Sequence, residues 1–224
     1  KSHTDSIYSS NATERPTDSR LNTDFQVVKV IDIIRQITQI IMAVREIVRM
    51  GHPTLRKVAE PYPIQQIGSD SFFELVEDMR ETLHCAGGIG LAAPQIDVPF
   101  QIAVVEITDP ITRYGEIQTL PFEVYINPTI TVENAASAGY WEGCLSVPGM
   151  MGFVERPQHI RVDYLDSSAK KKSMQLKGFL ATVFQHEFDH LLGKLYVDRI
   201  SDMSLFSFDL EYQLYHLNSH SSES

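Results

Sequence analysis

The sequence predicts an α+β domain in which mainly antiparallel β-sheets surround a buried helix near the C-terminus. Three observations lead to this prediction: an amphipathic helical pattern lies early in the domain, several short strand-like runs follow it, and a helix that is apolar around most of its circumference comes last. This order of elements is typical of α+β folds. The chain has 224 residues, 43% of them hydrophobic and 21% charged, which is the composition of a globular protein with one domain of ordinary size.

The first 41 residues are expected to form an extension before the domain. Residues 1–24 are rich in Ser, Thr, Asn and Asp without any period, which is typical of disorder. Residues 25–50 carry apolar side chains every three or four positions, which predicts an amphipathic helix. Lys29 and Asp32 interrupt this pattern, so we do not expect it to span a membrane.

We expect the main folded domain to occupy residues 42–208. Because the domain is expected to begin at Met42, the segment 1–41 is expected to be dispensable. Residues 209–224 are expected to hold a helix end and a polar tail.

The first helix of the domain is expected to begin at Ser69 or Asp70, since either side chain can cap it. Gly87 and Gly88 should end it. Its predicted apolar face consists of Phe72, Phe73, Val76, Met79 and Leu83.

Strand-like runs rich in Val, Ile and Tyr follow, with Pro and Gly between them. The predicted strands are residues 101–107, 124–127, 129–133, 160–165 and, more weakly, 174–177. The last long helix is expected at residues 178–192. Its apolar residues cover most of its circumference, so it should be buried.

The net charge of −10 argues against specific nucleic-acid binding, because neutralising phosphates needs clustered Lys and Arg. The only basic cluster, residues 170–172, is expected at a hairpin tip. Two lone cysteines fit a reducing compartment, so a cytoplasmic location is expected. No run approaches the roughly 18–20 apolar residues of a membrane span, so no membrane association is expected.

The strongest chemical signal is the run from His186 to His190, which reads His-Glu-Phe-Asp-His within the last helix. A spacing of four residues puts both imidazoles on one helical face, one turn apart, so both can bind one metal ion. Glu187 flanks the same face and can act as a base toward water. Surface His-x-x-x-His pairs are common and mostly without function. Here the helix is apolar, and buried polar groups need partners, so the pattern predicts a metal site.

A hydrolytic metal site also needs a third protein ligand, and the residues leave two candidates. Cys144 lies in a Gly-containing stretch, and a thiolate is a good ligand for iron or zinc, although a lone Cys is often only a small buried hydrophobe. Glu211 follows His190 by 21 residues on a predicted helix, an arrangement that some zinc peptidases use. The two candidates predict different enzymes.

Three segments, residues 88–95, 142–146 and 186–190, together resemble the signature motifs of peptide deformylases. They occur in the order found in that family, and the resemblance runs from about Met42 to about Phe208. It implies a peptide deformylase-like fold. It also implies metal-dependent hydrolysis of the N-formyl group from the N-terminal formyl-methionine of newly synthesised proteins, with release of formate.

The resemblance also implies roles for individual residues. Cys144, His186 and His190 would bind the metal, and Glu187 would be the general acid and base. The side-chain amide of Gln95 and the backbone N–H of Leu145 would donate to the developing oxyanion. Substrate contacts are expected from Ile89, Gly90, Glu142 and Gly143. From its position one turn before His186, Val183 is expected to be a further pocket wall. Glu142, Asp189 and Arg199 can either orient the ligands or form surface or structural ion pairs.

By the same resemblance the cofactor is one divalent metal ion, Fe(II) natively, with Zn(II) or Ni(II) as substitutes. The partners are N-formyl-methionyl peptides and nascent chains near the ribosome. Two other hypotheses remain: a metallopeptidase that uses Glu211 as its third ligand, and a non-catalytic member of the fold that binds a metal or a nascent chain. The presence of Gln95, Cys144 and Glu187 together argues against the second.

Overall fold

The computed structural model describes Lys29 and residues 44–112, 115–116 and 118–217. The chain divides into two units, residues 1–41 and 42–224, and the elements discussed below belong to the second. The expected disorder, most of the expected N-terminal helix and the polar tail lie outside the described residues. Within the described part of the chain, no helix combines the length and apolar character needed to cross a membrane.

Helix α2 (Asp70–Ala86) begins and ends where the sequence predicts. The Ser69 hydroxyl caps it by accepting a hydrogen bond of 3.2 Å from the backbone N–H of Phe72. Gly87 ends it in the left-handed conformation, with φ of 67°. The prediction for Phe73 was wrong, because this residue is 54% exposed, whereas Phe72, Met79 and Leu83 are fully buried.

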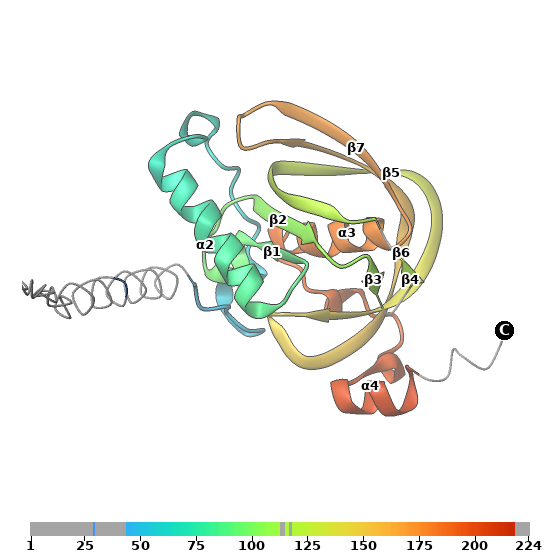
Figure 1. Cartoon of the computed structure of the whole chain (residues 1–224). Coiled ribbons are helices and arrows are strands. Elements are labelled where there is room, and N and C mark those ends of the chain that lie inside the picture. The colour runs from blue at the N-terminus through green and yellow to red at the C-terminus, as the bar shows by residue number, and fades with distance from the viewer. Residues whose placement is uncertain (1–28, 30–43, 113–114, 117, 218–224) are drawn as a thin grey trace, which may run out of the picture. The chain divides into compact units, whose positions relative to one another are not determined.

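One antiparallel sheet organises the domain (Figure 1). Its strands run in the order β1, β2, β5, β6, β7, and β8 pairs with β6 outside this path. The bounds are β1 (Gly90–Ala92), β2 (Ile102–Ile107), β5 (Leu120–Cys144), β6 (Val147–Leu165), β7 (Lys171–Lys177) and β8 (Phe206–Phe208), and a separate small sheet pairs β3 (Ile111–Thr112) with β4 (Gly115–Glu116).

The hairpin of β5 and β6 is much longer than the sequence predicts. The separate strands expected at residues 124–127 and 129–133 are parts of one strand, whose register with β6 shifts between Ile126 and Thr129. Asn127 lies at this irregularity with φ of 50°, and its side chain bonds the backbone N–H and C=O of Tyr62 at 2.7 and 3.0 Å. The distal part of the hairpin has little apolar alternation, so its strands depend on pairing with each other rather than on local pattern.

Residues 44–49 correct the expected helix over residues 25–50, because they form neither helix nor strand. Their backbone bonds neighbouring segments instead: the N–H of Val48 donates to the C=O of Gln95 at 2.8 Å, and the N–H of Met50 donates to the C=O of Ser146 at 2.7 Å. Tertiary hydrogen bonds therefore override the helical spacing of the apolar residues here.

Helix α3 (Phe179–Leu191) lies inside the curve made by β5, β6 and β7 (Figure 1). Phe184 is fully buried and meets Tyr125 of β5 edge to face, with ring centroids 4.9 Å apart. The remaining helices are short: the 3-10 turns η1 (Pro53–Arg56), η2 (Ile64–Gln66), η3 (Ala93–Ile96), η4 (Tyr196–Arg199) and η5 (Met203–Leu205), and the helix α4 (Asp209–Tyr215).

Candidate metal centre

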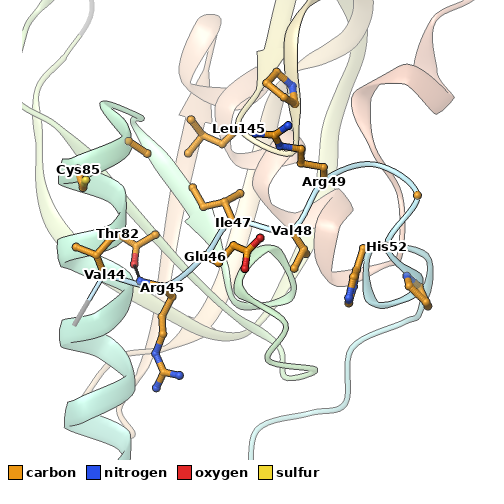
Figure 2. Close-up of a pocket in the computed structure, with 14 residues that line it drawn as sticks. Val44, Arg45, Glu46, Ile47, Val48, Arg49, His52, Thr82, Cys85 and Leu145 are labelled. Atoms are coloured by element: carbon orange, nitrogen blue, oxygen red, sulfur yellow. Dashed lines mark hydrogen bonds between the residues drawn. The ribbon is translucent and has the colours of Figure 1, made fainter. Parts of the chain in front are cut away.

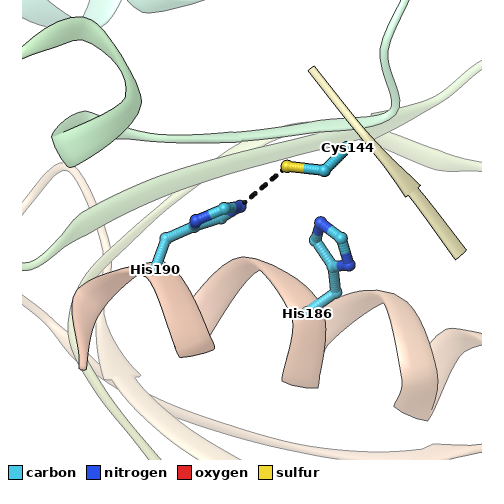
Figure 3. A group of neighbouring side chains, drawn as sticks. All are labelled: Cys144, His186 and His190. Atoms are coloured by element: carbon cyan, nitrogen blue, oxygen red, sulfur yellow. Dashed lines mark hydrogen bonds between the residues drawn. The ribbon is translucent and has the colours of Figure 1, made fainter. Parts of the chain in front are cut away.

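A thiol and two imidazoles meet between the β5–β6 hairpin and α3 (Figure 3). His186 and His190 lie one turn apart on α3, and Cys144 is the last residue of β5. The ligand atoms of the three residues lie within 4.8 Å of one another, and the Sγ of Cys144 is 3.4 Å from the Nε2 of His190. The structure thus brings together the three residues that the sequence indicated.

The three donors fit a single metal ion. Ligands bound at about 2.0–2.3 Å around a tetrahedral ion lie roughly 3.3–3.6 Å apart, which matches the sulfur–nitrogen distance found here. One thiolate and two imidazoles suit Fe(II), Zn(II) or Ni(II) better than Mg(II) or Ca(II), which prefer oxygen donors. The site can therefore hold a transition-metal ion and leave a position open for other ligands.

The thiol of Cys144 is poised to ionise. Burial disfavours the thiolate, but the charge of His190 and hydrogen bonds with both imidazoles outweigh burial and lower the pKa of Cys144 to about 5. Since the thiolate is the form that binds metals, the site favours the ligating form at neutral pH.

Glu142 fixes one of the two imidazoles. Its Oε2 lies 2.7 Å from the Nδ1 of His186, which leaves Nε2 of that ring as the atom available to a metal. Glu142 in turn accepts hydrogen bonds of 2.7 and 3.0 Å from the guanidinium of Arg156. Arg156 also bonds Asp189 of α3 at 2.8 Å, and Asp189 accepts two further bonds from Arg199.

In this chain of contacts Glu142, Arg156 and Asp189 are buried, His186 is half-buried and Arg199 is exposed. Burial alone would raise the pKa of Glu142, but its hydrogen bonds with His186 and Arg156 outweigh this and lower the pKa. The pKa of Asp189 is lowered in the same way, against burial, by Arg199 and Arg156. Both carboxylates are therefore charged and can orient the helix that carries the imidazoles.

Arg156 belongs to this network of contacts but was not predicted from the sequence. It lies in β6, in a part of the chain where no strand was expected, and only 3% of its surface is exposed. Val154 is fully buried two positions earlier, so the two side chains share one face of the strand. If this strand had been predicted from the sequence, an Arg on its apolar face would have indicated a buried ion pair.

Glu187 lies beside the three possible ligands and is itself buried. Among the described residues, its Oε2 has no hydrogen-bond partner. Burial raises the pKa of Glu187 above its usual value, although the neighbouring imidazoles act in the opposite direction. Its carboxyl group lies against β1: a Cβ added at Gly90 would be 2.5 Å from the Glu187 carboxyl carbon, so Gly90 provides the space that Glu187 occupies.

Gln95 is held in place by both ends of its amide. Its Oε1 accepts a bond of 2.8 Å from the N–H of Ala92, which turns Nε2 toward the hairpin tip. Nε2 lies 3.2 Å from the hydroxyl of Ser146 and 3.6 Å from the Sγ of Cys144. Ser146 was not singled out from sequence, although it lies within one of the three motifs. Leu145 lies between Cys144 and Ser146 at the tip of the hairpin.

A cavity of about 640 Å³ opens onto these residues. The expected substrate contacts all line it: Ile89, Gly90, Glu142, Gly143 and Val183. The carboxylate of Glu142 is occupied by His186 and Arg156, so only its stem is free to face a substrate. The cavity is also lined by Trp141, Met150, Met151, Phe179 and Asp209.

A second cavity of about 850 Å³ shares the lining residues Leu145 and Pro148 with the first, and Figure 2 shows Leu145 among its lining residues. It is lined mainly by the segment from Val44 to Pro53 and by Thr82 and Cys85 of α2. None of the three possible metal ligands lines it. Cys85 is exposed and unbonded to Cys144, so the two cysteines are free thiols.

Glu211, the rival third ligand, is exposed on α4 and is not part of the group of Cys144, His186 and His190. Within the part of the chain that the structure describes, Cys144 is the residue that completes the group. The geometry therefore gives no support to a metallopeptidase site built with Glu211.

Comparison with known proteins agrees with this geometry. The sequence profile of the family described as polypeptide deformylase matches residues 44–205. A peptide deformylase of Leptospira biflexa is 44% identical over 168 residues, which cover 75% of this chain and 94% of that protein. Peptide deformylase 2 of Pseudomonas syringae is 41% identical over 165 residues, which cover 74% of this chain and 92% of that protein.

Solved structures are similar as well. A class I type b peptide deformylase of Acinetobacter baumannii with Met-Ala-Ser bound superimposes with a TM-score of 0.66 and 32% identity, over 70% of this chain and 98% of that one. A peptide deformylase of Synechococcus elongatus in complex with actinonin gives a TM-score of 0.62 and 34% identity, over 70% of this chain and 79% of that one.

Proposed function

The chain belongs to the polypeptide deformylase family, a family of metal-dependent hydrolases that remove the N-formyl group from nascent peptides, and we propose that Cys144, His186 and His190 bind its metal. One observation carries this proposal: a sulfur from the β5–β6 hairpin and two imidazoles of α3 converge within 4.8 Å. The 3.4 Å between sulfur and Nε2 supports ligation of one ion by both residues.

The native ion in this proposal is Fe(II), and Zn(II) or Ni(II) can replace it. The donor set of one thiolate and two imidazoles suits all three ions, and the preference for Fe(II) follows the family resemblance. When bound, the ion supplies Lewis acidity, which makes water a competent nucleophile at neutral pH and polarises the formyl carbonyl.

Glu187 is the general acid and base. It takes a proton from the attacking water and passes it to the amine that leaves when the formamide C–N bond breaks, so that formate and a free N-terminus result. Its burial supports this role, as does its Oε2, which has no hydrogen-bond partner among the described residues. A carboxylate with a raised pKa and a free oxygen can both accept and return a proton.

Gln95 and Leu145 stabilise the charge that develops on the formyl oxygen. The hydrogen bond from the N–H of Ala92 to Oε1 directs the Nε2 amide of Gln95 toward the cavity side of the hairpin tip. The backbone N–H of Leu145 is the second donor. Removing one such donor typically lowers the rate by about 100- to 1,000-fold.

The methionine side chain of the substrate occupies the 640 Å³ cavity. Ile89, Val183 and the stem of Glu142 form apolar walls, while Gly90 and Gly143 bring the protein backbone close to the substrate backbone. The partners are N-formyl-methionyl peptides and nascent chains near the ribosome, and the enzyme acts in the cytoplasm.

A formate-release assay with formyl-Met-Ala-Ser, combined with metal analysis of anaerobically purified protein, tests the proposal. Glu187→Gln should retain its metal and lose at least 100-fold in kcat, whereas Cys144→Ala should lose both metal and turnover. Glu211→Ala serves as the control and should change neither. Retention of metal by Cys144→Ala together with its loss from Glu211→Ala would refute the ligand assignment.

A deletion tests the organisation of the chain. We propose that the extension of residues 1–41 is dispensable, so a protein that starts at Met42 should fold and turn over formyl-Met-Ala-Ser at the rate of the full chain. A collapse of folding or turnover in the shortened protein would contradict this.

A further inference from the structure

The charged residues that line the substrate cavity are unevenly distributed. Three acidic residues line it, Glu142, Glu187 and Asp209, whereas no Lys or Arg occurs among the cavity's described lining residues. Two of these carboxylates are accounted for by the site itself. Glu142 is neutralised by Arg156 and bonded to His186, and Glu187 faces the three metal-binding side chains. Asp209 is left as an acid that the site does not use.

The carboxylate of Asp209 is open to solvent at the cavity rim. Its Oδ2 accepts a hydrogen bond of 3.2 Å from the side-chain amide of Gln213, one turn later on α4. No ion pair joins it to any cation among the described residues. Its negative charge is therefore available to a bound molecule.

The position of Asp209 is fixed by the structure on both sides. On one side, β8 pairs with β6, which places Phe208 opposite Met150. On the other side, Tyr212 of α4 is buried against Trp141, with ring centroids 5.0 Å apart. Met150 and Trp141 both line the cavity, so Asp209 is anchored between two of its walls.

Asp209 also lies beyond residues 44–205, the part of the chain that matches the family. The elements that hold it, β8 and α4, begin at Phe206. The acid thus lies outside the part of the chain that the family profile matches.

We propose that Asp209 is a specificity-determining residue that favours substrates with a cationic side chain downstream of formyl-methionine. This inference rests on the proposed function, because it assumes that a formyl-peptide extends from the metal centre along the 640 Å³ cavity. A Lys or Arg side chain of the peptide pairs with Asp209, whereas an Asp or Glu side chain is repelled. Because the carboxylate is exposed and screened by salt, the preference is about two- to fivefold in kcat/KM for each charge.

Asp209 also occupies the first turn of α4, where a carboxylate is favourable whatever the substrate. Glu211 lies in the same turn and is exposed, but it does not line the cavity. Glu211→Gln is therefore the matched control, since it removes the same charge from the same helix without changing the cavity.

The experiment measures kcat/KM on the metal-loaded full chain for formyl-Met-Ala-Lys, formyl-Met-Lys-Ala, formyl-Met-Ala-Glu and the neutral formyl-Met-Ala-Ala. The wild-type protein should prefer the Lys peptides over the Glu peptide, mainly through KM, and added salt should reduce the preference. Asp209→Asn should bring the ratio close to one, Asp209→Lys should invert it, and Glu211→Gln should leave it at the wild-type value.

The outcomes separate the two proposals. Turnover of formyl-Met-Ala-Ala without discrimination between Lys and Glu peptides overturns the role of Asp209 and leaves the deformylase function intact. Absence of turnover with any of the peptides, in protein that holds its metal, counts against the proposed function instead. Equal changes in Asp209→Asn and Glu211→Gln would mean that net charge, rather than the cavity rim, sets the preference, and would also overturn the proposal.

Discussion

Helices α2 and α3 differ in sequence pattern, since α2 is amphipathic and α3 is apolar around most of its circumference, and they are stabilised in different ways. Helix α2 is capped by Ser69 and Gly87 and buries one face, with charged side chains on the other. Helix α3 has no side-chain cap and is buried around most of its circumference, including Glu187 and Asp189. Local caps therefore fix the ends of α2 and one apolar face packs into the core, whereas α3 depends all round on partners supplied by β5 and β6. The cost of burying polar groups on α3 is tolerated because those groups form the site.

The dependence of α3 on the β5–β6 hairpin is tested most strongly at Arg156, which links the two through ion pairs. Arg156→Met should lower the free energy of unfolding by about 3–5 kcal/mol, because the carboxylates of Glu142 and Asp189 are left buried without their shared cation. Urea denaturation followed by circular dichroism measures the change. Arg161→Met is the control. Its ion pairs with Glu133 and Asp163 are open to solvent, so its loss should be much smaller, and equal losses would contradict the account.

The close packing of β1 against α3 offers a second test of how strongly α3 depends on its neighbours. Gly90→Ala places a Cβ 2.5 Å from the Glu187 carboxyl group, so the carboxylate must move. We expect a loss of about 1–3 kcal/mol in stability and about a 10- to 100-fold drop in kcat, with the metal content unchanged. Gly68→Ala, just before α2, controls for the substitution itself. The new side chain is strained by the positive φ of 89° at this position, but its Cβ meets no atom within 4 Å, so only the stability should fall. A normal kcat in Gly90→Ala would show that Glu187 does not need this position.

On α2 the expected effects are smaller and leave the chemistry unchanged. Ser69→Ala removes the cap that accepts the N–H of Phe72, which should cost about 1 kcal/mol. Amide hydrogen exchange should show faster exchange in the first turn of α2, with kcat and metal content as in the wild type. Any loss of metal would mean that α2 is coupled to the site after all.

The smallest effect is expected at Phe73, whose side chain is 54% exposed on α2. Phe73→Ser should change the free energy of unfolding by less than about 0.5 kcal/mol. Phe72→Ala, one position earlier and fully buried, should cost about 3–5 kcal/mol. Thermal unfolding of the two variants tests whether α2 has a single buried face. Similar losses of stability in both variants would show that the buried face is wider than the structure indicates.

The elements that could be predicted from sequence are those with local signals. Ser69 and Gly87 mark the ends of α2 because capping depends on residues within one turn. The imidazoles of His186 and His190 share a face because helix geometry alone puts them there. Cys144 could be chosen over Glu211 only through the resemblance of three motifs, since nothing local brings a hairpin residue to a helix 42 positions away.

The features that were missed depend on contacts distant in sequence. Residues 44–49 carry a helical pattern, but their N–H groups bond Gln95 and Ser146, and no local rule predicts such partners. The distal half of the β5–β6 hairpin lacks apolar alternation and exists through pairing. Arg156 was missed for the same reason, because its strand was not recognised and its two carboxylate partners come from β5 and α3.

The placement of Cys144 at a hairpin tip has a consequence for the unfolding of the protein. An ion shared by this thiol and the imidazoles of α3 acts as a reversible cross-link that closes a loop of about 40 residues, and such closure reduces the conformational entropy of the unfolded chain. Chelators should therefore lower the melting temperature, and free metal should raise it by mass action. The residues that bind the metal would then also determine the thermal stability of the enzyme.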